Sequence, residues 1–330
     1  MPNKFRTEVM PERAPFRIDH STPTLLIGSC FAQHMGQLMA NGKMPTLTNP
    51  FGTMYNPMSV AQCIDHLLNT TPINSDALFE HQGVWRHFDF HSELAHPCPE
   101  QCLKSINTAI ANGAEFLRCA QRLVITFGTA RFYRRASNGQ PVANCHKLPA
   151  AHFTHELMPV EQIVAQWNSI IIRLLDINPN LKIVFTVSPI RHWKDGAVQN
   201  QRSKATLMLA VGQLVERHPN ATYYFPAYEL LMDDLRDYRF YADDMLHPAP
   251  TAVEYIWEKF RHSTMDEPTL RLLAQVERIV RAAQHRPFNP HTAEHQHFVR
   301  QTLDNIAQLC EQHPELRFDE EEAQLRSALD

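Results

Sequence analysis

Glycine is scarce in this sequence, with ten glycines among 330 residues against 23 prolines. Loops that cradle phosphates need clustered glycines, because glycine lets backbone N–H groups come close to the ligand. No GxGxxG motif occurs, and the nearest approach to a P-loop ends at Gly42-Lys43, with Met44 where a magnesium-binding Ser or Thr belongs. These absences exclude the nucleotide-binding folds that depend on such loops.

Several other features are also missing. The sequence has no apolar run of the roughly 18 residues that span a bilayer, no Lys/Arg run, no CxxC pair among its seven cysteines and no signal-peptide pattern. Lys+Arg 31 against Asp+Glu 35 gives a formal charge of −4. We therefore expect a cytoplasmic protein with free thiols, without a nucleic-acid or membrane partner.

Short apolar runs alternate with helical patterns through the first 260 residues. Each run is followed by a turn-forming residue, as is typical of strands buried on both faces of a sheet. The runs are Thr24–Ile27, Leu123–Phe127, Leu181–Val187 and Ala221–Phe225. This alternation predicts an α/β/α sandwich around a parallel sheet, with ligands at the carboxyl ends of the strands.

The pattern becomes purely helical after about residue 262. Thr264-Met265-Asp266-Glu267 has the form of a capping box, and helical apolar patterns follow it, the second over about 291–311. We therefore predict a main domain of residues 1–262 and a C-terminal helical extension of residues 263–330. The extension is a candidate surface for homo-oligomer formation.

The sharpest local motif is Gly28-Ser29-Cys30-Phe31-Ala32, where the first strand ends and a helix begins. The unpaired N–H groups and the dipole of a helix N-terminus favour a reactive thiolate there. The alternative is a small buried side chain at a crowded junction, because cysteine is among the most buried residue types.

A second motif, Asp244-Met245-Leu246-His247-Pro248, lies in a loop after the last predicted strand. An Asp three residues before a His can orient the imidazole through one ring nitrogen and leave the other free as a base. Alternatively, Asp and Pro only shape the loop that enters the next helix.

Taken together with further motifs, these segments resemble the GSCFA-domain proteins and, through them, the SGNH/GDSL hydrolase superfamily. The resemblance covers roughly residues 20–262 and includes Asn49-Pro50-Phe51-Gly52, Phe127-Gly128-Thr129-Ala130, Asn144-Cys145-His146-Lys147 and Thr186–His192. It implies a flavodoxin-like three-layer sandwich, no cofactor, and a nucleophile directly after the first strand.

The resemblance also implies the roles of individual residues. Aligning Gly28 with the family's glycine puts Cys30 at the position of the nucleophilic serine, with His247 as base and later acid and Asp244 as its orienting partner. Ser29 is the nucleophile if the register differs by one.

An oxyanion hole in this superfamily uses the nucleophile's N–H, a glycine N–H and an asparagine side chain. Gly52 matches the glycine, but the block that should supply the asparagine is Gly128-Thr129-Ala130-Arg131. Thr129 or Asn144 would have to donate instead, since losing one donor typically costs about 10²–10³ in rate.

The remaining candidates concern substrate and metal. Arg191, His192 and Lys147 could grip an anionic part of a substrate, or simply be solvated. His291-Thr292-Ala293-Glu294-His295 matches a zinc-protease pattern, and Cys98 and Cys102 lie near two histidines, but neither group has a complete ligand set. We expect no metal.

The sequence thus predicts a hydrolase or acyltransferase that acts on a small ester, such as O-acyl groups on carbohydrate, through an acyl-enzyme on Cys30. The alternative is a catalytically weak or inactive domain of the same fold that binds an acylated or glycan ligand. The missing asparagine favours this alternative.

Overall fold

A parallel five-stranded sheet forms the centre of the protein in the computed structural model, which describes residues 6–285, 287–289 and 292–329. Its strands are β1 (Thr24–Gly28), β2 (Thr46–Thr48), β5 (Arg122–Phe127), β9 (Lys182–Val187) and β10 (Thr222–Phe225). Their spatial order is β10-β9-β5-β1-β2, with every neighbouring pair parallel. Numbered along the chain within this sheet, the order is the 2-1-3-4-5 of flavodoxin-like folds.

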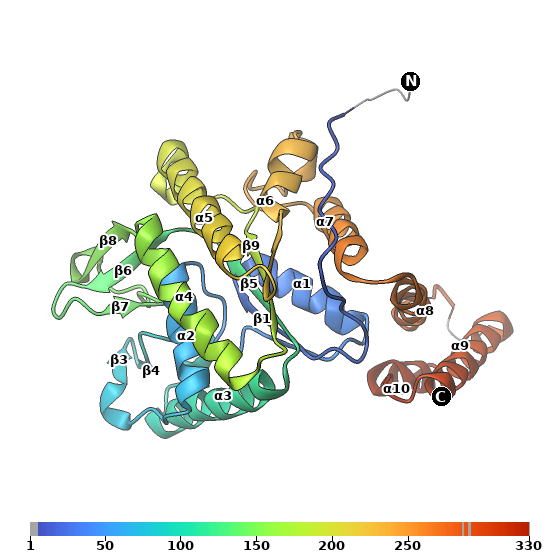
Figure 1. Ribbon diagram of the computed structural model, residues 1–330. Coiled ribbons are helices and arrows are strands. Elements are labelled where there is room, and N and C mark those ends of the chain that lie inside the picture. The colour runs from blue at the N-terminus through green and yellow to red at the C-terminus, as the bar shows by residue number, and fades with distance from the viewer. Residues whose placement is uncertain (1–5, 286, 290–291, 330) are drawn as a thin grey trace.

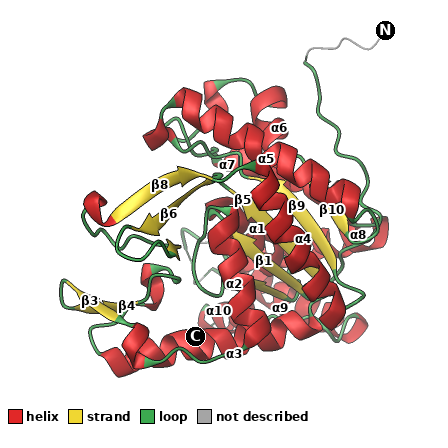
Figure 2. Cartoon of the chain, turned by 60° about the vertical axis from the view of Figure 1, so that its left-hand side comes forward, coloured by secondary structure: helices red, strands yellow, loops and turns green. Residues whose placement is uncertain are grey.

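Helices cover both faces of the sheet, so the predicted three-layer sandwich is confirmed (Figures 1 and 2). Leu25 and Ile27 point into one core with α2 (Pro57–Asn69), α3 (Pro99–Cys119), α4 (Val160–Ile177) and α5 (Ala197–Arg217). Leu26 points into the other, with α1 (Cys30–Asn41) and α7 (Pro250–Thr264). Side chains of alternate residues in one strand therefore point into opposite cores, as a strand buried on both faces requires.

The sheet register aligns the strand ends at which a ligand site is expected. Gly28 of β1 pairs with Thr126 of β5, and Thr126 pairs with Thr186 of β9. The three central strands therefore end at one edge. The strand order reverses between β1 and β5, and ligands of such sheets bind at that switch point.

Small antiparallel sheets and short helical turns lie in the segments that connect the main strands and helices. The small strands are β3 (Phe79–His81), β4 (Val84–Arg86), β6 (Arg131–Arg135), β7 (Pro141–Val142) and β8 (Phe153–Leu157). The short turns are η1 (Ser75–Ala77), η2 (Ser92–Leu94), η3 (Ala150–His152), η4 (Trp193–Asp195), α6 (Ala227–Glu229), η5 (Leu230–Asp234) and η6 (Tyr238–Phe240).

The C-terminal region consists of α8 (Glu267–Ala283), α9 (Ala293–Gln312) and α10 (Asp319–Ser327), which share a hydrophobic cluster of their own. The predicted capping box at Thr264 is wrong, because Thr264 is the last residue of α7. Asp266 caps α8 instead, its carboxylate accepting the Thr269 N–H at 3.0 Å. The division at residue 262 stays a prediction.

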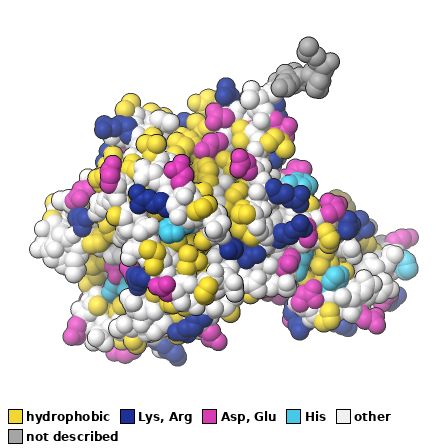
Figure 3. Space-filling model, in the orientation of Figure 1, with side chains coloured by type: hydrophobic (Ala, Val, Ile, Leu, Met, Phe, Trp, Pro, Cys, Tyr) yellow, Lys and Arg dark blue, Asp and Glu magenta, His cyan; other side chains and the backbone are white. Residues whose placement is uncertain are grey.

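Ion pairs join this region to the main domain, and the most buried of them is formed by Lys43 and Glu321. Lys43, just past the end of α1, donates from Nζ to both carboxylate oxygens of Glu321 in α10 at 2.7 Å. Their side chains are only 15% and 10% exposed. Leu273 of α8 also belongs to the core formed with α1 and α7. On the face of the molecule seen in Figure 3, acidic and basic side chains are interspersed.

Candidate functional site

The turn from β1 to α1 depends on Gly28. Its φ is +150°, and a Cβ there would lie 2.3 Å from the carbonyl oxygen of Thr126, so only glycine fits. The Gly28 N–H donates to Asn49 Oδ1 at 2.8 Å, and its carbonyl accepts the Met54 N–H at 2.8 Å. The loop after β2 therefore fixes the direction in which the chain enters α1.

Ser29 and Cys30 occupy different positions in this turn. Ser29 is the N-cap of α1: its hydroxyl oxygen accepts the Phe31 N–H at 3.2 Å, and the residue is 2% exposed. Cys30 opens the helix and is half-buried. Within the described residues the Cys30 N–H has no hydrogen-bond partner, as expected in the first turn of a helix. The thiol is thus more accessible than the neighbouring hydroxyl.

Tyr55 lies beside the thiol, with its hydroxyl 3.6 Å from Cys30 Sγ and 3.3 Å from the hydroxyl of Thr53. Its ring packs edge-on against His192 at 5.5 Å between centroids. Desolvation raises the pKa of Tyr55, with the neighbouring thiol adding to the effect. Tyr55 was not among the residues expected here, although it stands between the Gly52 motif and the start of α2.

The loop before α7 carries the Asp–His pair. His247 Nδ1 lies 2.5 Å from Asp244 Oδ2, while Asp244 Oδ1 accepts the N–H groups of His247 and Leu246 at 2.9 Å each. These bonds, the His247 N–H first, lower the pKa of Asp244 to about 2. The carboxylate therefore stays ionised and fixes the imidazole through Nδ1, which leaves Nε2 available.

His247 lies close enough to two other histidines for its charge to act on them. Desolvation and then the charge of His247 lower the pKa of His34, one turn beyond Cys30 on α1. Burial, the Lys204 ammonium and His247 together lower the pKa of His192 to about 4. The loop of His247 is therefore electrostatically coupled to the beginning of α1 and to the loop after β9.

Lys204 is a second residue that the sequence did not reveal. It is fully buried on α5, and its Nζ donates to the carbonyls of Gly128 and Ser188 at 2.6 Å each. Burial lowers the pKa of Lys204 to about 7. The only signal was a lysine at helical spacing from Leu207 and Val211 on an apolar face. It joins the loops that follow β5 and β9.

Three predicted oxyanion or substrate groups are engaged in the fold itself. The Gly52 N–H donates to the Asn49 carbonyl at 2.8 Å. The Thr129 hydroxyl lies 2.9 Å from the Ser203 hydroxyl and accepts the Arg131 N–H. Asn144 Oδ1 accepts the His146 N–H at 2.8 Å. The Gly52 N–H and the Thr129 hydroxyl therefore each have a partner within the fold, and their part in an oxyanion hole stays a prediction.

The residues predicted to bind an anionic part of the substrate differ in their contacts and exposure. The guanidinium of Arg191 lies over the rings of Trp193 and Tyr241, at 5.4 and 5.5 Å. Tyr241 pairs with Pro248, so Arg191 packs near the His247 loop. Lys147, by contrast, is exposed on the loop after β7.

The described residues contain no group of three or more His, Cys, Asp or Glu side chains placed to hold a metal ion. His291, part of the zinc-protease pattern, lies outside them. The Cys98 thiol donates to the Glu100 carboxylate at 2.8 Å. Among the described helices, none is long and apolar enough to cross a membrane.

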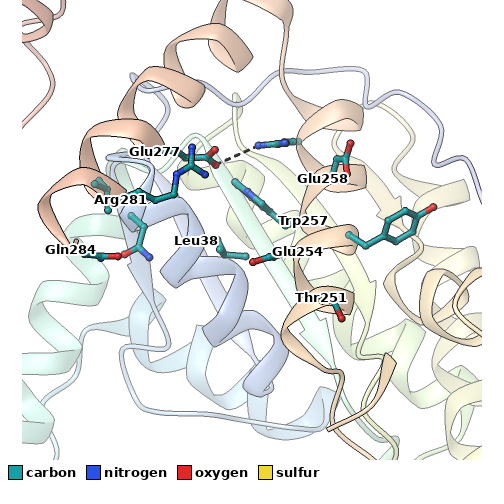
Figure 4. Close-up of a pocket in the computed structure, with 12 residues that line it drawn as sticks. Leu38, Thr251, Glu254, Trp257, Glu258, Glu277, Arg281 and Gln284 are labelled. Atoms are coloured by element: carbon teal, nitrogen blue, oxygen red, sulfur yellow. Dashed lines mark hydrogen bonds and ion pairs between the residues drawn. The ribbon is translucent and has the colours of Figure 1, made fainter. Parts of the chain in front are cut away.

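A cavity of about 530 Å³ lies elsewhere, between α1, α7 and α8 (Figure 4). Charged side chains such as Glu254, Glu258 and Arg281 line it. It includes none of the residues predicted for catalysis, so it does not mark the candidate site.

Comparison with protein families identifies the chain. The model of the GSCFA family matches residues 23–260. The chain belongs to the GSCFA family. The model described as the GSCFA domain protein C-terminal domain matches residues 276–330. Both parts of this GSCFA protein thus have counterparts among known sequences, and the resemblance to the GSCFA-domain proteins is confirmed.

Comparison with solved structures gives distant likenesses. A protein described as a GDSL-like lipase from Parabacteroides merdae is 11% identical, with a TM-score of 0.40 over 77% of this chain and 99% of its own. An acetyl xylan esterase from the rumen bacterium Butyrivibrio proteoclasticus is 9% identical, with a TM-score of 0.35 over 74% of this chain and 64% of its own. The comparison with curated proteins returned no match.

Proposed function

We propose that this GSCFA protein hydrolyses small esters through a thioester intermediate on Cys30. One observation carries the proposal: a half-buried thiol opens α1 at the carboxyl end of β1, and an Asp–His pair stands in the loop before α7. This edge of a parallel sheet is where ligands bind. A nucleophile, and a base oriented by a third group, are the parts that acyl transfer needs.

The reaction proceeds in two halves. His247 Nε2 takes the thiol proton while Cys30 Sγ bonds to the acyl carbon, and the carbonyl π electrons move to the oxygen. The tetrahedral intermediate then collapses, the C–O ester bond breaks, and the leaving alcohol takes the proton from His247. Water attacks the thioester with His247 again as base, the C–S bond breaks, and the acid and the thiol are released.

Hydrolysis and acyl transfer differ only in the second half of this reaction. An acceptor hydroxyl in place of water would give a new ester and make the protein an acyltransferase. The substrate class that we propose is O-acyl groups on carbohydrate, which the resemblance to the SGNH/GDSL hydrolases suggests.

Ser29 is the weaker candidate for the nucleophile. Its hydroxyl oxygen accepts a hydrogen bond as the helix N-cap, and almost none of the residue is exposed. Moving this hydroxyl to a substrate would uncap α1, at a cost of about 1 kcal/mol.

Short-chain p-nitrophenyl esters test the proposal. Cys30→Ala and His247→Ala should lose turnover, iodoacetamide should inactivate the wild type, and Ser29→Ala should retain activity. Cys119→Ala is the matched control, since Cys119 is an exposed thiol. Equal turnover by Cys30→Ala and the wild type would show that the thiol mechanism is wrong.

The second candidate function is a weak or inactive domain that binds an acylated or glycan ligand. It is favoured by the missing asparagine and by the engagement of the Gly52 N–H within its own turn. Absence of any ester or thioester cleavage, combined with saturable binding of an acetylated oligosaccharide, would support it.

A further inference from the structure

Tyr55 is fixed at the switch point of the sheet by its own backbone. The N–H groups of Gly128 and Thr129, just past β5, both donate to the Tyr55 carbonyl, at 2.7 and 2.9 Å. Gly128 and Thr129 begin the block from which the superfamily's asparagine is missing. These bonds fix the Tyr55 backbone beside the end of β5, and the phenol hydroxyl lies beside Cys30, which follows β1.

The Tyr55 hydroxyl is close enough to serve the oxygen that develops during attack. It lies 3.6 Å from Cys30 Sγ. In the tetrahedral intermediate the oxyanion is bonded to the same carbon as Sγ, so it forms within reach of this hydroxyl. Effective oxyanion donors stand about 2.7–3.1 Å from that oxygen.

We propose that Tyr55 is a catalytic residue, which donates a hydrogen bond from its hydroxyl to the oxyanion in place of the missing asparagine. The inference rests on the proposed function, because the oxyanion forms only if Cys30 attacks an acyl carbonyl. The Cys30 N–H, which has no partner in the described part of the chain, is the other donor. The phenol keeps its proton throughout, and the leaving alcohol is protonated by His247.

The surroundings of Tyr55 keep it a preorganised donor. Desolvation raises the pKa of the phenol, so it is protonated at neutral pH. The Thr53 hydroxyl, 3.3 Å away, can donate to the phenol oxygen while the phenol donates onward. His192 packs edge-on against the ring, and the Tyr55 backbone is held as described. Such a donor needs no reorganisation as charge develops.

Tyr55→Phe tests the assignment, because it removes the hydroxyl and keeps the ring. We expect kcat for p-nitrophenyl acetate to fall about 10²–10³-fold with KM little changed. Alkylation of Cys30 by iodoacetamide should continue at nearly the wild-type rate, because substitution at a saturated carbon forms no oxyanion. Thr53→Val, which removes the adjacent hydroxyl and leaves the phenol, should lower kcat by less than about tenfold.

The outcomes separate this inference from the function on which it rests. If Cys30→Ala is inactive and Tyr55→Phe turns over like the wild type, the Tyr55 assignment alone is overturned. A parallel loss of turnover and of alkylation in Tyr55→Phe would also overturn it, since the hydroxyl would then act on the thiol. If Cys30→Ala matches the wild type, the proposed function fails and the Tyr55 assignment fails with it. Urea unfolding of each variant confirms that it is folded.

Discussion

Lys204 Nζ donates to the Gly128 carbonyl at 2.6 Å, across 76 positions of the sequence and from α5 to the loop after β5. The same ammonium binds the Ser188 carbonyl at 2.6 Å. Lys204→Met would fill the space but leave both carbonyls without their donor. Each buried unsatisfied group costs about 1–3 kcal/mol, so we expect the free energy of unfolding to fall by about 2–6 kcal/mol.

Urea unfolding measures this loss. Lys194→Met is the control, because Lys194 is exposed and its Nζ only approaches the Tyr133 hydroxyl at 3.5 Å. A Lys204→Met protein as stable as the wild type would mean that release of the buried charge offsets the two lost bonds.

Asp244→Asn should lower turnover while preserving the loop. The amide can still accept the backbone N–H groups of Leu246 and His247, but it no longer stabilises an imidazolium through Nδ1. We expect kcat to fall by about 10²–10⁴-fold. Steady-state ester hydrolysis measures the change. Asp243→Asn, one residue earlier in the same loop, should keep nearly full activity.

Acid should destabilise the protein partly through His146. This buried ring lies 3.2 Å from the Ser92 hydroxyl and 2.9 Å from the His87 carbonyl, and burial lowers its pKa to about 4. The unfolded chain therefore binds more protons between pH 6.5 and 4, and stability falls as the pH falls through that window. One such group contributes up to about 1.4 kcal/mol per pH unit.

His146→Gln keeps hydrogen-bonding groups but does not titrate. Its free energy of unfolding, measured in urea at pH 7, 6 and 5, should decline less steeply than that of the wild type. The same substitution at the exposed His297 should leave the slope unchanged. Identical slopes for His146→Gln and the wild type would exclude this assignment.

The Lys43–Glu321 pair should stabilise the C-terminal helices. Glu321→Gln removes the charge opposite a mostly buried ammonium, which should cost about 1–3 kcal/mol and speed amide exchange in α10. Lys43→Met combined with Glu321→Leu should cost less than the single change. Glu322→Gln, which breaks an exposed pair with Arg326, should have little effect. Hydrogen exchange of the full chain distinguishes these variants.

The sequence predicted the parts of the fold that are buried on both faces. β1, β5, β9 and β10 appear as continuous apolar runs because each is covered by helices on two sides. β2 contributes only Thr46–Thr48, half-buried at the sheet edge, and so has no such run. The α8 cap was misplaced because Thr264 and Asp266 are both good cap residues, and only the path of α7 decides between them.

The candidate site, too, was predictable only in part. Cys30, Asp244 and His247 stand in motifs whose spacing carries information. Tyr55 and Lys204 gain their importance from contacts with distant segments, and a lone tyrosine or lysine has no spacing pattern. Gly52 matched a motif, yet its N–H turns back to Asn49, which no residue pattern records.

Helix α1 connects the candidate nucleophile to the C-terminal helices. Cys30 is its first residue, and Lys43 follows its Gly42 cap, so the thiol and the ion pair to α10 lie at opposite ends of one rod of about 18 Å. A chain cut before α10 would therefore leave the Lys43 ammonium without its carboxylate partner, at the far end of the helix that Cys30 opens.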